Sequence, residues 1–201
     1  MQLGMAAVRD GILRQWHDFV GPEATRTDNV RTLTLAAVGG LAARRLSRHD
    51  VSSTDALVLD GLAVDLWGGA WANNTRACAR WYERPGQTDR DHLTFAAAHL
   101  HPLAYAWIDR HHRAKPAVWA AAHYGYLLGA TVVIRAWPRH RRLLGVLTTV
   151  GGVALDRALG PSKAAPWFGP VFYAKLLLGH ASAARWSDAE LAAAPDLGAI
   201  R

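Results

Sequence analysis

Two carboxylates inside an apolar segment are the first residues of this chain that could do chemistry, because an ionisable group among apolar residues is costly without a partner or water. Asp60 and Asp65 lie five residues apart in the segment 56–75. This spacing separates them by about 140° around a helix, so a paired-carboxylate mechanism is not implied. Either one, buried in an apolar pocket, could protonate an alkene, epoxide or carbonyl group. Alternatively, one of them caps or salt-bridges at a helix end.

Four histidines could exchange protons with these carboxylates, since imidazole changes its charge near neutral pH. His99 and His101 directly precede Pro102, which has no N–H to donate to the carbonyl of Ala98. In a continuous helix that carbonyl stays unpaired beside two imidazoles, which predicts a local polar pocket. For each histidine alone, a structural hydrogen-bonding role is the alternative. The other two candidates are His123 and His180.

Lys175 stands near the middle of the last apolar segment. A lysine at this position is the most costly side chain of the chain if the segment is buried in lipid, so it requires an acidic partner. The candidates inside apolar segments are Asp60, Asp65 and Asp156. The alternative is that its ammonium group reaches past the end of the segment to polar surroundings.

Aromatic residues accompany these groups at helical spacing. Trp119, His123 and Tyr126 recur at i, i+4 and i+7, which gives one polar and aromatic stripe. The stripe could line a cavity for a flat or isoprenoid-like ligand, or it could be a seam between helices. Tyr173 and His180 are seven residues apart and are predicted to share a helix face. The candidate substrate-binding residues are Trp67, Tyr105, Trp119, Tyr126, Tyr173 and Lys175.

Motifs for metal or nucleophile chemistry are absent. A metal site needs three or four convergent ligands, and the histidines lack the HxxxH and HxxHH spacings of membrane di-iron enzymes. Cys78 is the only cysteine, so an internal disulfide and a cysteine-rich metal site are excluded. Glycine-rich phosphate loops and GxSxG elbows do not occur. We expect neither a metal nor a cofactor.

The element that carries His123 has the length of a membrane span. Residues 116–134 contain no charged side chain and are bracketed by Arg113, Lys115 and Arg135. At about 1.5 Å per residue, a helix needs roughly 20 residues to cross a hydrocarbon core of about 30 Å. Gly125 and Gly129 form a GxxxG pair there, which predicts close approach of another helix. The pairs Gly68–Gly69 and Gly151–Gly152 are predicted to pack in the same way.

Composition supports this interpretation in part. Only 19% of the residues are charged, against about 25% in a typical soluble domain, and several of the nine tryptophans lie near the ends of apolar stretches. Against it stand the mean hydropathy of −0.01 and the charged residues inside candidate spans. The net charge of +7 is distributed in clusters between apolar segments, as anionic lipid headgroups would favour, and no nucleic-acid-binding pattern accompanies it. The clusters are Arg44, Arg45 and Arg48; Arg76, Arg80 and Arg84; Arg110, Arg113 and Lys115; and Arg139, Arg141 and Arg142.

Periodicity predicts an all-α fold, a polytopic membrane helical bundle with five or six spans. We assign residues 1–30 to an N-terminal amphipathic, interfacial segment, 31–186 to the helical membrane domain and 187–201 to a C-terminal tail. The apolar segments lie near 31–46, 54–72, 93–109, 116–136, 143–160 and 165–184. With six spans, fourteen Lys and Arg fall on the side of the termini and eight on the other, which predicts that both termini are cytoplasmic.

The functional expectation is a small integral membrane enzyme that uses intramembrane Asp and His groups for acid–base chemistry on a lipophilic, isoprenoid-like substrate. Isomerisation, cyclisation and hydrolysis all fit these groups. The alternatives are a membrane carrier or proton-coupled transporter with a switchable Asp–Lys pair, a structural membrane subunit, and a soluble helical domain. The oligomeric state is left open by the sequence.

Overall fold

The protein is a bundle of helices in the part of the chain that the structure, a computed structural model, describes: residues 2–193, with side chains from residue 11 onward. No strand occurs in this range, which confirms the all-α prediction for it. The elements are α1 (Gln2–Val20), α2 (Arg26–Leu46), α3 (Ser53–Ala72), α4 (Arg76–Tyr82), α5 (Asp89–Ala98), α6 (His101–Ile108), α7 (Pro116–Ala136), the 3₁₀ turn η1 (Pro138–His140), α8 (Arg141–Leu159), α9 (Phe168–Tyr173), the π-helix η2 (Ala174–Ala181) and α10 (Asp188–Ala192).

Helices α2 and α5 begin earlier than the apolar pattern predicts, because capping residues set their first turns. The side chain of Thr25 accepts a hydrogen bond from the backbone N–H of Asp28, and the Asp28 carboxylate accepts one from the N–H of Thr25. This capping box starts α2 at Arg26, although the apolar run begins several residues later. Thr88 and Asp91 start α5 in the same way. The first turn of each of these helices is therefore polar, and each helix begins before its apolar run.

The segment predicted as one apolar stretch near 93–109 forms two helices. Helix α5 ends at Ala98 and α6 begins at His101, with Pro102 in its first turn. Pro102 cannot continue the hydrogen-bond ladder, so the chain turns at His99 and Leu100. The carbonyl of Ala98 accepts a hydrogen bond from the N–H of Leu100 at 3.0 Å. The expectation of an unpaired Ala98 carbonyl is therefore wrong, because the helix breaks at this point.

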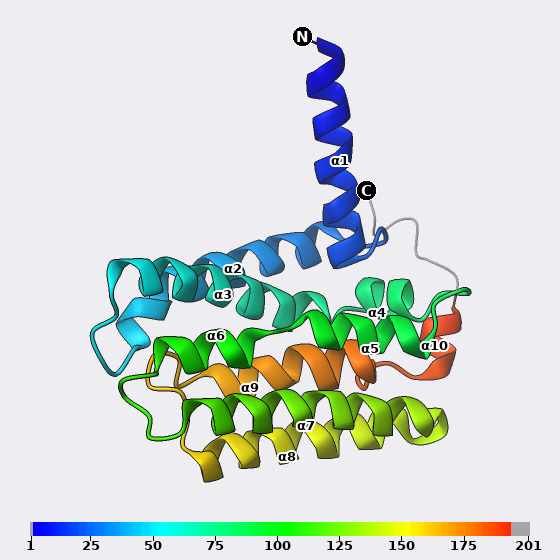
Figure 1. Ribbon diagram of the computed structural model, residues 1–201. Coiled ribbons are helices and arrows are strands. Elements are labelled where there is room, and N and C mark those ends of the chain that lie inside the picture. Colours follow the sequence, from blue (N-terminus) through cyan, green and yellow to red (C-terminus); the bar gives the residue numbers. More distant parts are fainter. Residues whose placement is uncertain (1, 194–201) are drawn as a thin grey trace.

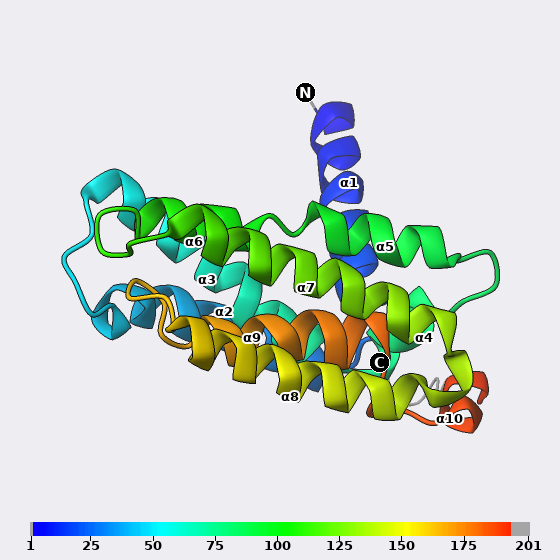
Figure 2. The ribbon, with the colours of Figure 1, turned by 60° about the horizontal axis from the view of Figure 1, so that its bottom comes forward.

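The last long helical stretch, α9 followed by η2, forms the centre of the bundle. Its neighbours are α3, α5, α7 and α8, and Figures 1 and 2 show it enclosed by these helices in both views. The side chains of Phe168, Phe172 and Leu177 are fully buried. Because this stretch is surrounded, its one charged residue, Lys175, lies in the interior and not at the surface.

Helices α2 and α3 form an antiparallel hairpin that packs through glycines. A Cβ atom on Gly39 would lie 2.5 Å from the ring of Trp67, and one on Gly68 would lie 3.0 Å from the Cβ of Ala36. These short distances show that only glycine permits this helix spacing. By contrast, a Cβ on Gly125 or Gly129 would meet nothing within 4 Å. Within the described chain, the predicted close contact at the GxxxG pair is therefore wrong.

Helix α1 points away from the bundle, in a direction transverse to the long axis of the other helices (Figure 1). It contacts the rest of the chain mainly through α4. Near the bundle, Trp16 donates a hydrogen bond to Asn29 at 2.8 Å, and Val20 is buried. The predicted N-terminal helix is present, whereas the side chains of residues 1–10 and the part of the predicted tail at 194–201 lie outside the described residues.

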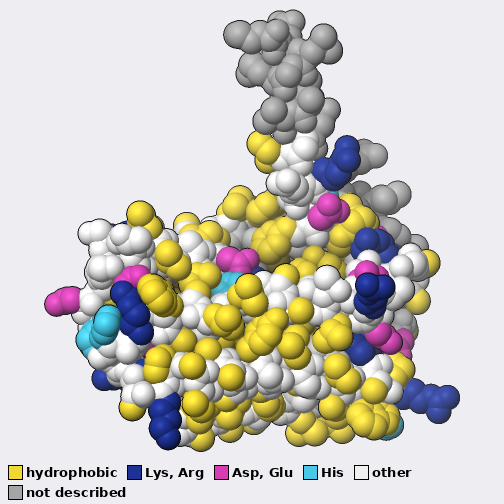
Figure 3. All heavy atoms as spheres, viewed as in Figure 1, with side chains coloured by type: hydrophobic (Ala, Val, Ile, Leu, Met, Phe, Trp, Pro, Cys, Tyr) yellow, Lys and Arg dark blue, Asp and Glu magenta, His cyan; other side chains and the backbone are white. Residues whose placement is uncertain are grey.

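One described helix, α7, is both long and apolar enough to cross a membrane, by length and composition alone. The face of the bundle in Figure 3 is mainly hydrophobic along its middle, and basic side chains gather toward its two ends. Exposed apolar side chains on α3, α7 and α8 include Leu57, Val118 and Val150, each more than half exposed. The prediction of five or six spans stays a prediction.

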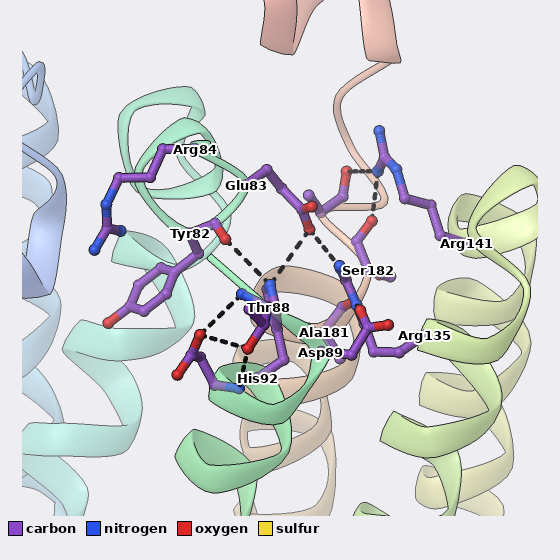
Figure 4. A network of polar contacts seen from close by, with 12 residues as sticks. Tyr82, Glu83, Arg84, Thr88, Asp89, His92, Arg135, Arg141, Ala181 and Ser182 are labelled. Atoms are coloured by element: carbon purple, nitrogen blue, oxygen red, sulfur yellow. Dashed lines mark hydrogen bonds and ion pairs between the residues drawn. The ribbon is translucent and has the colours of Figure 1, made fainter. Parts of the chain in front are cut away.

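Many of the clustered arginines bind the protein itself. Arg135 contacts Glu83 at 2.7 Å and Asp89 at 2.8 Å, and Arg141 donates to the carbonyl of Ser182 at 2.5 Å (Figure 4). The same pattern holds elsewhere: Arg44 contacts Asp60, Arg80 contacts Glu23, Arg110 contacts Asp55, and Arg113 donates to carbonyls of residues 159–161. These arginines join helix ends, so fewer of them are free to bind an external anion.

Candidate functional site

The principal polar contact inside the bundle joins Asp65 on α3 to Lys175 on η2. The Lys175 ammonium nitrogen lies 2.5 Å from Oδ2 of Asp65. The lysine side chain is 1% exposed, whereas the aspartate side chain is 41% exposed. Of the three aspartates that the sequence offered as partners of Lys175, the structure selects Asp65. In this pair the lysine ammonium group is buried, whereas the aspartate carboxylate is partly accessible to solvent.

Two local features of the chain make room for this lysine. A Cβ atom on Gly69 would lie 2.5 Å from Cε of Lys175, so glycine at this position provides the space for the lysine stem. Lys175 also stands in the π-helix η2, whose backbone is wider than an α-helix and often occurs at functional sites. Asn73 donates a hydrogen bond to the Lys175 carbonyl at 3.2 Å. The end of α3 thus fixes the backbone that carries the ammonium group.

His101 is the third member of this site. Its Nε2 lies 2.9 Å from Oδ2 of Asp65, the same oxygen that Lys175 contacts. The ring of His99 stacks on that of His101 at 5.4 Å, and its Nδ1 lies 2.7 Å from the carbonyl of Phe95. Both histidines are placed here by the break between α5 and α6. The break brings His101 to Asp65, whereas the predicted polar pocket at this point stays a prediction.

Asp65 lies at the edge of an apolar groove of about 360 Å³ between α1, α2 and α3. In Figure 3, an acidic and a histidine side chain are enclosed by hydrophobic ones near the middle of the drawn face. The groove combines one carboxylate with aromatic and aliphatic walls, as a site for a mostly apolar ligand requires. Its lining residues are Trp16, Phe19, Thr32, Leu33, Ala36, Gly61, Val64, Asp65 and Gly68.

The ion pair assigns opposite charges to two of these groups, Asp65 and Lys175. An ammonium group 2.5 Å away stabilises the ionised form of Asp65, and the carboxylate in turn stabilises the ammonium of Lys175. Oδ1 of Asp65 makes no hydrogen bond to another described residue, so this oxygen can accept a proton or a hydrogen bond from a ligand. The Lys175 ammonium is the proton-bearing partner of this carboxylate. The expected role of the aspartate as a proton donor is thus less favourable here than that of an acceptor.

A second cluster lies between α7, α8 and α9 and is sealed. Nδ1 of His123 lies 2.7 Å from the hydroxyl of Tyr173, and its Nε2 lies 3.6 Å from Oδ1 of Asp156. The side chains of His123 and Asp156 are both 0% exposed. Trp119 packs on the imidazole with ring centroids 4.1 Å apart. The predicted stripe of Trp119 and His123 therefore faces the interior of the bundle as a seam between helices.

From the sequence, Asp156 was a candidate partner of Lys175 only. Its position beside His123 was not predicted. A Cβ atom on Gly169 would lie 2.6 Å from the Asp156 carboxyl carbon, and one on Gly152 would lie 2.6 Å from the Tyr173 ring. These two glycines close the space around the cluster. A substrate has no route to it in the described structure, so we assign it a packing role.

His180 is separated from both clusters. Its ring stacks on Phe95 at 3.7 Å and lies 4.8 Å from His92 and 4.4 Å from Tyr82. Tyr173 instead contacts α7 and α8. The prediction that Tyr173 and His180 share one face is wrong, because the π-helix between them has more residues per turn than an α-helix.

Asp60 also lies apart from Asp65, as their spacing predicts. Arg44 donates to its Oδ2 through Nε at 2.8 Å and through Nη2 at 2.5 Å, and the Arg44 side chain is 53% exposed. This is an ion pair between two adjacent helices at the surface. Asp60 therefore follows the alternative interpretation, in which one aspartate forms a salt bridge.

The remaining predicted binding residues pack inside the bundle. Trp67 and Tyr105 both contact Trp167 edge to face. Tyr126 donates from its hydroxyl to the carbonyl of Thr148 at 2.8 Å. None of these three lines the groove beside Asp65. Conversely, the groove residues Trp16 and Phe19 lie on α1, and no pattern in the sequence indicates that this helix borders the groove beside Asp65.

Other reactive groups do not form a further site. Cys78 is buried on the short helix α4, and burial raises the pKa of its thiol to about 12, so the thiol stays protonated at neutral pH. Among residues with described side chains, no group of three or more His, Cys, Asp or Glu is arranged to bind a metal ion. The open polar site is therefore that of Asp65, His101 and Lys175.

Comparisons of the chain with models of known protein families, with curated proteins and with solved structures found no match. The function of the site consequently has to be argued from its own geometry.

Proposed function

We propose that the chain is a multi-pass membrane protein whose bundle lies along the membrane normal. Outward-facing apolar side chains along the long helices support this. Leu57, Val132 and Val150 are 69%, 51% and 62% exposed. Soluble monomers rarely leave such side chains in one continuous patch. Lipid would cover this surface without the free-energy cost that water imposes.

Helix length supports the same orientation. Helices α2, α3, α7 and α8 contain 21, 20, 21 and 19 residues, which gives each a rise of about 30 Å, the thickness of a hydrocarbon core. Of these, α3 is less apolar than α7 because it carries Asp60 and Asp65. Their partners, Arg44 and Lys175, neutralise both charges within the protein.

Helix α1 extends across the bundle axis, so in this orientation it lies parallel to the membrane plane (Figure 1). An amphipathic helix at that level would bury its apolar face at the headgroup boundary. We propose that the side of α1, α4 and α10 faces the cytoplasm, because more Lys and Arg fall on that side than on the other.

Membrane fractionation tests this part of the proposal. After expression of the full chain, membranes are washed at alkaline pH and then extracted with mild detergent. We expect the protein to stay in the pellet through the wash and to dissolve with detergent. Recovery in the soluble fraction without detergent contradicts the proposal, because the apolar surface would then be covered by protein or water.

We further propose that the protein is an enzyme that moves a proton on a lipophilic, isoprenoid-like substrate at Asp65. The observation that carries this proposal is the position of Asp65, which contacts both Lys175 and His101, at the edge of an apolar groove. Oδ1 of Asp65 would accept a proton from the substrate or from water. His101 or the Lys175 ammonium would donate one, and the apolar walls would hold the hydrocarbon part.

Lipid analysis of cells that express the chain tests the chemistry. The variants D65N and H101Q are compared with the unchanged chain, and D60N serves as the matched control because it makes the same substitution on the same helix. We expect a lipid product that disappears in D65N, falls in H101Q and persists in D60N. An identical lipid profile for all four proteins rejects the enzyme proposal.

A proton-coupled transporter is the second candidate, favoured by the fact that Asp65 and Lys175 lie on different helices and could separate and re-pair. Reconstitution in proteoliposomes distinguishes the two. A transporter moves an unchanged solute with a proton flux that D65N abolishes, whereas an enzyme alters its substrate. If neither is observed and D65N only prevents assembly with other proteins, the pair has a structural role.

A further inference from the structure

A second concave site lies at the end of the bundle that carries α4 and α10. It is a pocket of about 380 Å³ formed by the start of α2, the end of α3 and the segment after η2. This volume is sufficient for a phosphate together with a small polar headgroup. The pocket does not include Asp65, His101 or Lys175. Its lining residues are Glu23, Thr25, Asp28, Arg31, Trp71, Asn74, Thr75, Arg76, Ala77, Arg185 and Trp186.

Three guanidinium groups border this pocket without a carboxylate partner among the described side chains: Arg31, Arg76 and Arg185. At the same end of the bundle, Arg80, Arg135 and Arg141 do contact carboxylates. A larger hollow nearby, of about 660 Å³, is bordered by Arg80 and Arg141, which contact Glu23 and Asp188 at 2.9 Å and 2.6 Å. The smaller pocket thus gathers three guanidinium groups that have no carboxylate partner among the described side chains.

The two carboxylates in the pocket wall are already engaged. Oε2 of Glu23 lies 2.9 Å from Nε of Arg80. Oδ2 of Asp28 accepts hydrogen bonds from the N–H of Thr25 at 3.2 Å and from its hydroxyl at 2.7 Å. Since both acidic groups serve the protein, the three arginines can bind an external anion.

Aromatic rings orient two of these arginines. The guanidinium of Arg31 lies 4.9 Å from the ring centroid of Trp71, and that of Arg185 lies 5.7 Å from the ring of Trp186. Trp186 is itself fixed, because its indole N–H donates to the carbonyl of Asn74 at 3.2 Å. Stacking reduces the freedom that each side chain loses on binding, which favours a planar, bidentate contact with phosphate oxygens.

We infer that this pocket binds a phosphate group through Arg31, Arg76 and Arg185. The group could belong to the headgroup of an anionic lipid or to a free phosphate, since both present the same oxygens. The inference does not depend on the proposed acid–base chemistry, because none of its residues belongs to that site.

Binding measurements on the purified full chain in mild detergent test the inference. One arm titrates inorganic phosphate and pyrophosphate by calorimetry. The other detects bound phosphatidylglycerol by native mass spectrometry, with phosphatidylcholine for comparison. The variants are R31Q and R185Q, and the matched control is R139Q, which removes an exposed arginine at the same end of the bundle. R185K retains the charge but not the bidentate geometry.

We expect R31Q and R185Q each to weaken binding about tenfold, R185K to weaken it less, and R139Q to leave it unchanged. Binding of inorganic phosphate in the first arm identifies a soluble ligand, and binding of the lipid alone identifies a headgroup. Equal losses in R139Q and the pocket variants indicate general surface charge and overturn the inference, as does the absence of binding in both arms. Thermal unfolding of each variant verifies that it folds, and activity at Asp65 provides an independent readout.

Discussion

Two clusters in this bundle combine an aspartate with a histidine, and they differ in access. Asp65 and His101 lie beside an apolar groove, with the Asp65 side chain 41% exposed. Asp156 and His123 are fully buried behind tightly packed glycines. The same residue types thus serve two purposes. Access to a ligand, and not residue type, distinguishes a candidate catalytic group from a packing group.

The largest expected effect is that of breaking the open pair. D65N leaves the Lys175 ammonium buried without its counter-charge, which costs about 3 kcal/mol of unfolding free energy, at the low end for a buried pair because Asp65 is partly exposed. For a chain of this size, this corresponds to a fall in Tm of roughly 6–12 °C. Thermal unfolding in detergent measures it.

A double variant sharpens that prediction. D65N combined with K175M removes both charges, so we expect it to regain most of the lost stability while any activity at the site stays absent. If the double variant is as unstable as D65N, the ion pair is not the cause of the loss. If it is both stable and active, the site does not depend on these charges.

Gly69 provides a second test of the open cluster. G69A places a Cβ atom 2.5 Å from Cε of Lys175 and displaces the ammonium from Asp65, so we expect a loss of about 1–3 kcal/mol together with loss of activity. The matched control for stability is G61A on the same helix, where the added Cβ meets nothing within 4 Å; its activity is not compared, because Gly61 lines the groove. Because alanine favours helix, G61A should be stabilising by about 0.5–1 kcal/mol. Similar stabilities of the two variants contradict the assigned packing.

The sealed cluster should affect stability alone. Y173F removes the hydrogen bond between the Tyr173 hydroxyl and His123, which predicts a loss of about 1 kcal/mol and no change in the lipid product. Unfolding and lipid analysis of the same preparation measure both. A lost product at unchanged stability would reverse the roles that we assign to the two clusters.

The smallest expected effect is that of D60N. The pair of Asp60 and Arg44 is largely exposed, and such pairs contribute about 0–1 kcal/mol. We expect a change in Tm within about 3 °C and an unaltered lipid profile. A large loss of activity in D60N would make Asp60 a candidate catalytic residue again, as the sequence alone had suggested for both aspartates.

The sequence by itself determined the all-helical fold and the separation of Asp60 from Asp65, because both follow from the periodicity of residues along a helix. It also required an acidic partner for Lys175, because a buried ammonium group is costly. It placed the start of α2 too late, since the apolar pattern does not include the polar first turn that Thr25 and Asp28 form.

Only the tertiary structure decided which residues meet. Asp65 rather than Asp60 or Asp156 contacts Lys175 because α9 and η2 occupy the centre of the bundle and Gly69 leaves room for the lysine stem. The π-helix that turns His180 away from Tyr173 packs against several helices at once. The groove beside Asp65 depends on how the end of α1 packs near α2 and α3, since residues of all three helices line it. Periodicity fixes angles around one helix, whereas contacts between helices depend on the shape of every neighbour.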